Sequence, residues 1–143
     1  MIMNNLERSC GAIVFTRKEG RPLFVIVREM AGAYSFPKGH MEGNETEEET
    51  ARREIFEETG LRPRFLPGFT QQDEYDLAER PGFRKRVTYF LAEFEGGTLA
   101  PRPGEIREIL LLPYEQALTY FEHESTRRIL AAANDFLTVV HPV

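Results

Sequence analysis

The stretch "RREIFEETG", residues 52–60, concentrates negative charge in a segment with the spacing of a helix. It contains Glu54, Glu57 and Glu58, and positions three and four residues apart share one helix face. Glu54 and Glu58 would therefore repel each other, at a cost of about 0.2–0.5 kcal/mol. We expect a positive charge to offset this repulsion, supplied by the protein or by a bound cation.

Local signals define the ends of this helix. Thr46 and Glu49 have the spacing of a capping box, and Gly60 suits the left-handed conformation that follows a helix. These signals predict a helix over residues 46–59. Its apolar stripe is thin, so the acidic side must face water or a ligand.

The clustered carboxylates allow two interpretations. One is a solvated acidic face, on which Arg53 pairs with Glu49 and Glu57, each four residues away. The other is a cation site, because hard divalent ions such as Mg²⁺ bind carboxylate oxygens together with substrate phosphates. A cation would remove the repulsion and create a site for a polyphosphate.

The composition is that of a globular protein. The 143 residues are 41% hydrophobic and 29% charged, which fits one domain over residues 1–143, and the net charge of −5 argues against a nonspecific DNA coat. The single cysteine, Cys10, permits no disulfide within the chain and fits a reducing compartment. No apolar run approaches the ~18 residues of a membrane span, and the start "MIMNNLERS" lacks a signal-peptide pattern. We therefore expect a cytoplasmic protein that binds no membrane.

Apolar patterning predicts the other elements. Strands are expected at residues 9–16, 22–29, 64–75, 85–97 and 105–113, and helices at residues 114–121 and 125–140. The glycine-rich residues 30–45 are expected to form a loop. This order predicts a mixed sheet with helices packed over it, an α/β or α+β sandwich.

A longer motif surrounds the acidic helix. Five residues separate Gly39 from Glu45, and seven more lead to "REIFEETGL", residues 53–61. The pattern resembles the Nudix box, G-x5-E-x7-R-E-U-x-E-E-x-G-U with U apolar, at every defined position. The resemblance implies the Nudix fold, in which a loop–helix–loop box lies against a mixed sheet in an α/β/α sandwich. It also implies hydrolysis of a phosphoanhydride in a nucleoside diphosphate linked to another group, with Mg²⁺ or Mn²⁺ as cofactor.

The resemblance further implies roles for the box residues. Glu54 and Glu58 are expected to be the main metal ligands, with Glu57 also binding metal and Arg53 orienting the carboxylates. Glu45 is expected to support the box through Arg53. Which glutamate removes the proton from the attacking water stays open.

Other expected site residues lie around the helix. The resemblance implies that the backbone carbonyl of Lys38 is a metal ligand and that Gly39 follows it in a tight turn. Glu105, in "RPGEIRE", aligns with a glutamate that relatives use as an additional ligand, although a surface-loop glutamate is the alternative interpretation. Gly60 belongs to the box as its closing glycine.

The segments "SCGAIVF", "YSFPKGHMEGNE" and "KRVTYFLAEF" resemble the asymmetrical diadenosine tetraphosphate hydrolases. This resemblance implies conversion of diadenosine tetraphosphate to ATP and AMP. Phe36 and the segment "DLAERPGFRKR" depart from the pattern of those enzymes. Mutator-type nucleoside triphosphate pyrophosphatase, RNA 5′-end pyrophosphohydrolase and inositol-pyrophosphate phosphatase activities stay open. The non-enzymatic alternative is a nucleotide-sensing module. Loss of box glutamates would indicate such a module, and no box glutamate is lost.

Cations and aromatic rings are candidates for contacts to such a nucleotide. Lys38, His40 and Lys85 are candidates for binding phosphates, although Lys85 with its two neighbouring arginines also fits a solvated turn. Beyond this nucleotide we expect no partner, unless the chain forms a weak homodimer rather than a monomer.

Tyr75, Tyr89 and Phe121 are candidates for stacking on a base. For Tyr89 and Phe121 the alternative is packing in the core. The sequence gives no functional signal for His123 or His141, which are expected to lie at the surface.

Overall fold

The computed structural model describes residues 5–139. Its strands are, in chain order, β1 (Leu6–Lys18), β2 (Arg21–Glu29), β3 (Tyr34–Ser35), β4 (Lys38–His40), β5 (Arg64–Phe65), β6 (Gln71–Asp76), β7 (Arg84–Glu93) and β8 (Ile106–Pro113). Its helices are α1 (Glu47–Thr59), which lies between β4 and β5, and α2 (Tyr114–Leu118) and α3 (Glu124–Val139), which follow β8.

All these strands belong to one mixed sheet with β1 at its centre. β1 pairs in parallel with β7, with Leu6 opposite Arg84 and Phe15 opposite Glu93. On its other side β1 pairs antiparallel with β2 and with β4. β3 and β8 pair with β2, whereas β5 and β6 pair with β7.

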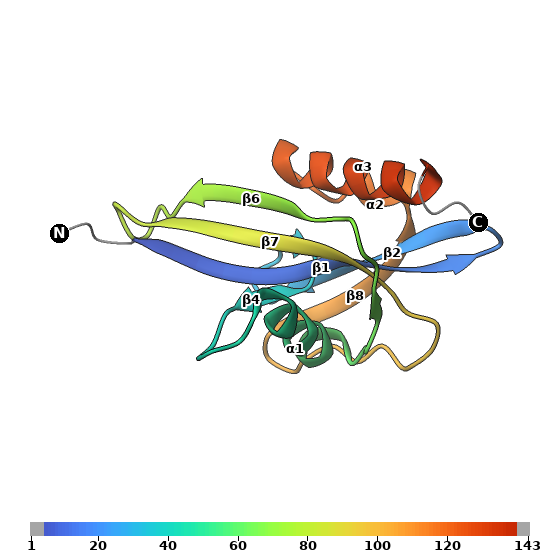
Figure 1. Ribbon diagram of the computed structural model, residues 1–143, viewed down its shortest axis with the longest axis horizontal. Helices are drawn as coiled ribbons and strands as arrows, with labels where there is room; N and C mark the ends of the chain where they lie inside the picture. The colour runs from blue at the N-terminus through green and yellow to red at the C-terminus, as the bar shows by residue number, and fades with distance from the viewer. Residues whose placement is uncertain (1–4, 140–143) are drawn as a thin grey trace.

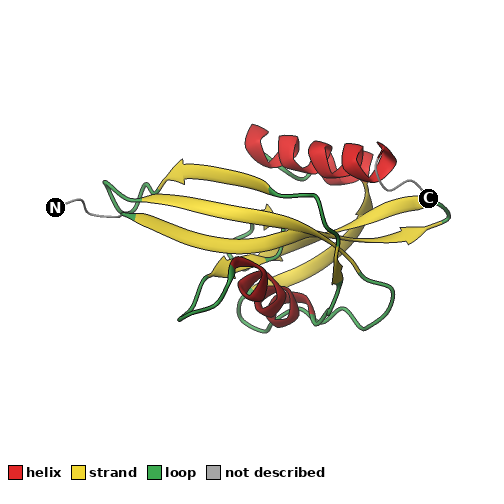
Figure 2. Cartoon of the chain, viewed as in Figure 1, coloured by secondary structure: helices red, strands yellow, loops and turns green. Residues whose placement is uncertain are grey.

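Helices cover both faces of the sheet, which gives the predicted α/β/α sandwich. Figure 1 shows α1 on one face and α2 with α3 on the other, and Figure 2 shows the same layers coloured by type. Successive residues of a strand point to opposite faces, so Ile13 and Phe15 join the core beside α3 while Ala12 and Val14 join the core beside α1. Burial on both faces explains why these strands are continuous apolar runs rather than alternating ones.

The acidic helix has the predicted ends. Thr46 Oγ1 accepts a hydrogen bond from the Glu49 amide while the Glu49 side chain accepts one from the Thr46 amide, and Gly60 has a φ of 79°. The carboxylates of the first helical turn also face the positive end of the helix dipole. This helix is confirmed, and its position on the sheet allows its acidic face to meet β4.

Three other predictions need correction. The expected loop over residues 30–45 contains β3, which folds back onto the end of β2, and β4, which pairs with β1 far away in the sequence. The single strand expected at residues 64–75 is two strands, β5 and β6, because the chain turns between them at Gly68, whose φ is 90°. The helix expected at residues 114–121 ends at Leu118. Over residues 5–139, no helix has both the length and the apolar character to cross a bilayer.

Candidate functional site

The acidic face of α1 is pressed against β4. Glu54 and Glu58 are each 7% exposed, an unusual burial for glutamates. Gly39 makes this packing possible, since a β-carbon there would lie 2.0 Å from Glu54 Cδ. The prediction that Gly39 is needed for a tight turn is wrong. Gly39 lies in strand β4, and its lack of a side chain makes room for the Glu54 carboxylate.

Arg53 holds the box together. Its guanidinium donates to Glu45 Oε2 at 2.6 Å, to Glu54 Oε1 at 2.8 Å and to the His40 carbonyl at 2.9 Å. The hydrogen bond from Arg53 is the main reason that the pKa of Glu45 falls to about 2. The expected contact between Arg53 and Glu45 is therefore present.

Positively charged side chains of the protein only partly offset the negative charge of the acidic face. Burial raises the pKa of Glu58 to about 8, against the opposing effect of the Lys38 charge, and the neighbouring Glu54 charge raises it further. Burial also raises the pKa of Glu54, although Arg53 opposes this shift. The Lys38 amide donates to Glu58 Oε1 at 3.3 Å. Two buried carboxylates with raised pKa values form a donor set suited to a hard cation.

Two arginines engage the third glutamate. Glu57 Oε1 accepts from Arg53 at 3.2 Å and from Arg102 at 3.0 Å. Arg102 also forms an ion pair of 3.0 Å with Glu105. Arg102 was missed by sequence reasoning, because nothing in its local pattern shows that the loop after β7 returns to α1. The other predicted partner of Arg53, Glu49, caps the helix instead.

These ion pairs affect how the site could bind a metal. Within residues 5–139 no three carboxylate, imidazole or thiolate side chains form a ready-made metal site. Glu54 and Glu58 offer oxygen donors that fit a divalent cation, although Glu54 Oε1 accepts from Arg53. Arg102 engages one oxygen of Glu57 and one of Glu105. A cation that used either of these two engaged oxygens would have to displace Arg102.

A cleft of about 380 Å³ opens beside this face, and we call it the box cleft. It brings together several of the predicted residues, which are Lys38, Gly39, His40, Glu58, Lys85 and Glu105. Burial lowers the pKa of His40, and the charges of Lys85 and Lys38 lower it further. The pKa of Lys85 is lowered by burial and by Lys38. These three residues thus form one basic cluster around the cleft.

The basic run "FRKR" divides between two environments. Lys85 lines the box cleft, whereas Arg84 pairs with Asp76 at 2.7 Å and Arg86 with Glu74 at 3.5 Å. The solvated-turn interpretation therefore describes the two arginines and not Lys85.

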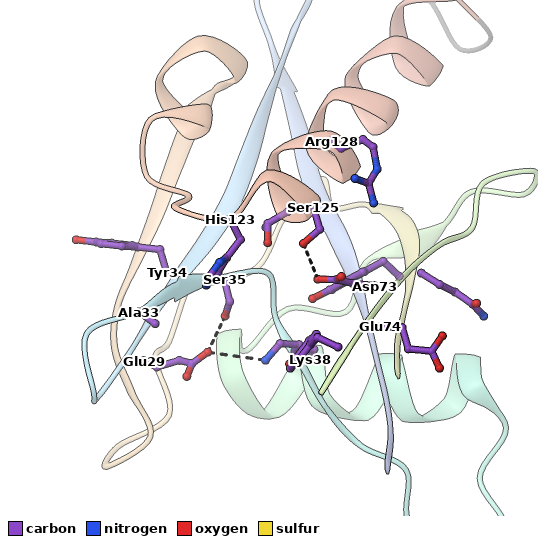
Figure 3. Close-up of a pocket in the computed structure, with 14 residues that line it drawn as sticks. Glu29, Ala33, Tyr34, Ser35, Lys38, Asp73, Glu74, His123, Ser125 and Arg128 are labelled. Atoms are coloured by element: carbon purple, nitrogen blue, oxygen red, sulfur yellow. Dashed lines mark hydrogen bonds and ion pairs between the residues drawn. The ribbon is translucent and has the colours of Figure 1, made fainter. Parts of the chain in front are cut away.

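A second cavity, of about 560 Å³, adjoins the first, and we call it the α3 pocket. Its walls come from the end of β2, from β3, from β6 and from the start of α3 (Figure 3). Glu29 and Lys38 line both cavities, with Lys38 Nζ 3.8 Å from Glu29 Oε2. Ser35 Oγ donates to the same Glu29 oxygen at 3.0 Å. This group therefore stands at the boundary between the two cavities.

The candidate stacking residues have different outcomes. Tyr75 is 40% exposed and lines the α3 pocket, and Tyr89 lines it too but is 5% exposed and also belongs to the core. Phe121 is 4% exposed and packs on Phe36 with ring centroids 5.0 Å apart. Stacking of a base on Phe121 is therefore wrong for this arrangement, because core residues cover the ring.

The histidines lead to one addition. His123 is exposed, as predicted, and it also lines the α3 pocket. The pocket also includes residues that sequence reasoning missed, among them Glu29, Asp73 and Ser125. Their local sequence shows no motif, and only the pairing of β6 with β7 and the packing of α3 bring them together. His141 lies outside the described residues.

Comparison with known proteins extends these observations. A family model described as NUDIX domain matches residues 6–133. The asymmetrical bis(5′-nucleosyl)-tetraphosphatase of Mus musculus is 28% identical over 142 residues, covering 91% of this chain and 95% of that protein. The 8-oxo-(d)GTP phosphatase of Mycolicibacterium smegmatis is 33% identical over 106 residues, covering 74% of this chain. This chain spans only 31% of the length of the mycobacterial protein.

Solved structures show the same fold. A C. elegans Ap4A hydrolase in a binary complex superposes with a TM-score of 0.84 at 20% identity, covering 92% of this chain and 98% of that one. The NUDIX domain of Shewanella oneidensis NrtR, in complex with ADP ribose, gives a TM-score of 0.73 at 14% identity, with 92% and 88% covered. At these identities the likeness concerns the fold.

Proposed function

Because this chain belongs to the Nudix family, whose hydrolases generally use divalent metals, we propose that it is a pyrophosphohydrolase acting on a nucleoside diphosphate linked to another group. The substrate that we propose is diadenosine tetraphosphate, cleaved asymmetrically to ATP and AMP. The tetraphosphatase relative supports this choice, since the likeness extends over nearly the whole length of both chains.

The observation that carries the proposal is the pair of adjoining cavities. The box cleft combines the buried carboxylate of Glu58 with Lys38, His40 and Lys85, which suits a phosphate chain together with a cation. The α3 pocket offers the exposed ring of Tyr75, which suits a base. Because Lys38 lines both cavities, one extended nucleotide can occupy them together.

We propose Mg²⁺ or Mn²⁺ as the cofactor. Glu54 and Glu58 would hold it, with Glu57, Glu105 and the Lys38 carbonyl as further candidates. When bound, the cation would neutralise phosphate charge and polarise the scissile phosphoanhydride.

The protein groups have separate tasks in this proposal. Arg53 orients Glu54 and Glu57 through its hydrogen bonds. Lys38, His40 and Lys85 hold the phosphates in place, and a box glutamate accepts the proton of the attacking water. Glu58 is a candidate for that last task because it is buried in the cleft where the water would react.

Product analysis tests the substrate assignment. Diadenosine tetraphosphate with Mg²⁺ should yield ATP and AMP in equal amounts, resolved by anion-exchange chromatography. Formation of two ADP molecules would reject asymmetric cleavage. No release of nucleotide at any divalent metal concentration would reject the proposal in favour of a nucleotide-sensing module.

A mutator-type nucleoside triphosphate pyrophosphatase is the second candidate. The mycobacterial 8-oxo-(d)GTP phosphatase, at 33% identity, favours it. The same assay with 8-oxo-dGTP, dGTP and ATP separates the two candidates by kcat/KM. A clear preference for a triphosphate over diadenosine tetraphosphate would establish the second.

The box assignment has its own test. Glu58→Gln removes a charge and little volume, so we expect kcat to fall by orders of magnitude with the fold intact. Glu48→Gln is the matched control, because Glu48 lies on the same helix but pairs with Arg52 at the surface. Near-native turnover by Glu58→Gln would contradict the metal role.

The cellular setting follows as a smaller proposal. We propose a cytoplasmic monomer or weak homodimer, which cell fractionation and light scattering would test.

A further inference from the structure

The α3 pocket contains a carboxylate with an open acceptor site. Asp73, on β6, is half-buried, and its Oδ2 accepts a hydrogen bond of 3.1 Å from Ser125 Oγ. Figure 3 shows these two side chains pointing toward each other at one side of the pocket. Among the described residues, Ser125 is the one hydrogen-bond partner of the Asp73 side chain. The hydroxyl fixes the carboxylate, and the second oxygen stays free to accept from a ligand.

Tyrosines line the same pocket as this acceptor. Asp73 and Tyr75 are two positions apart on β6, so their side chains leave the same face of the sheet, and both line the pocket together with Tyr89. Tyr75 is 40% exposed, so a flat group stacked on its ring would share the pocket with the Asp73 carboxylate. The pocket thus combines a stacking surface with a positioned acceptor.

The charge balance of the pocket disfavours phosphate there. Three carboxylates line it, those of Glu29, Asp73 and Glu74, against the cations Lys38 and Arg128. Glu29 already pairs with Lys38. An uncharged group that donates hydrogen bonds is therefore the better occupant, and the phosphates belong in the box cleft.

We propose that Asp73 determines base specificity by accepting a hydrogen bond from the exocyclic amino group of adenine. The inference rests on the proposed function, because it assigns the base of that substrate to the α3 pocket. An ionised carboxylate only accepts hydrogen bonds, so it suits the 6-amino group of adenine. The 6-oxo group of hypoxanthine would set an acceptor against this carboxylate. The protein should consequently prefer adenosine nucleotides to inosine nucleotides.

Binding and hydrolysis test this preference separately. Titration calorimetry of the full chain with AMP and with IMP isolates the base, since both ligands carry the same phosphate. We expect AMP to bind at least about tenfold more tightly, the scale of one hydrogen bond to a charged group. The ratio of kcat/KM for diadenosine and diinosine tetraphosphates should show the same preference.

Asp73→Asn is the decisive variant. The amide keeps an oxygen for Ser125 and turns an N–H donor toward the pocket, so the preference should disappear or reverse toward inosine. Asp76→Asn is the matched control, because Asp76 is on the same strand but pairs with Arg84 outside the pocket. This control should keep the preference of the wild-type protein.

The outcomes separate the two proposals. Equal binding of AMP and IMP, binding of neither, or an unchanged preference in Asp73→Asn would overturn the role of Asp73. A preference for AMP without hydrolysis of diadenosine tetraphosphate would support that role and reject the proposed reaction. Hydrolysis without base preference would reject the role of Asp73 alone.

Discussion

The Glu54 carboxylate occupies the space that a side chain on Gly39 would need. A β-carbon at Gly39 would lie 2.0 Å from Glu54 Cδ and 2.2 Å from Oε2. This contact fixes the distance between β4 and α1, which sets the position of the acidic face relative to the Lys38 backbone.

Gly39→Ala should therefore force Glu54 away from its place. We expect a loss of about 1–3 kcal/mol in the free energy of unfolding, as for other overpacked sites, and a large fall in kcat. Urea melts and steady-state kinetics would measure both. Gly96→Ala is the control, because a β-carbon there would meet nothing within 4 Å. Equal behaviour of the two variants would contradict this account of Gly39.

Glu58 should make stability depend on pH when metal is absent. Its pKa rises from an ordinary 4.5 to about 8 in the folded protein, mainly through burial. The folded protein therefore holds a proton on Glu58 that the unfolded chain releases. The resulting contribution to the free energy of unfolding is fully present below pH 4.5 and is lost as the pH rises to about 8. With a chelator present, the free energy of unfolding should fall across that window.

Glu58→Gln should flatten this pH dependence, since the amide stays neutral. The variant should also melt at a higher temperature than the wild-type protein at pH 8 without metal, because it has lost the repulsion with Glu54. Thermal melts at several pH values, with and without Mg²⁺, would measure this. The same slope in both proteins would disprove the assignment of the titration to Glu58.

Arg102 should compete with a metal ion for Glu57 and Glu105. Arg102→Ala frees Glu105 Oε2, leaves Glu57 Oε1 paired with Arg53 alone, and removes a nearby positive charge. We expect Mn²⁺ to bind the substrate-free protein about two- to fivefold more tightly, the scale of an exposed ion pair of ~0.2–1 kcal/mol. Arg62→Ala, at an arginine that stacks on Phe56, is the control. Weaker Mn²⁺ binding in Arg102→Ala would mean that Arg102 supports the site rather than blocks it.

Lys85 should contribute to substrate binding more than to turnover. Its ammonium group lines the box cleft, where Lys38 and His40 also lie. Lys85→Ala should raise KM on the order of tenfold, corresponding to ~1.4 kcal/mol, change kcat less, and make activity less sensitive to salt. Lys18→Ala removes an exposed charge at the end of β1 and should leave these parameters unchanged. An unchanged KM in Lys85→Ala would exclude it from the phosphate site.

Local interactions made the box predictable from sequence. The capping box at Thr46 and the left-handed Gly60 depend on residues a few positions apart, so they can be recognised without tertiary structure. The shared face of Glu54 and Glu58 follows from helical periodicity in the same way. The strands beside β1 were recognisable because burial on both faces makes them continuous apolar runs.

Contacts between distant segments decided the rest. Arg102 reaches Glu57 across 45 positions, and Ser125 reaches Asp73 across 52, so no local pattern records either pair. β4 pairs with β1, and Gly39 in β4 leaves space for the Glu54 carboxylate of α1. Phe121 is buried beneath α3, and a pocket lies beside Tyr75. The residues that could do the chemistry were recognisable from the amino-acid order alone, because their spacing along one helix is local. The surroundings of these residues depend on the folded chain, because sheet pairing and helix packing join segments that are far apart in the sequence.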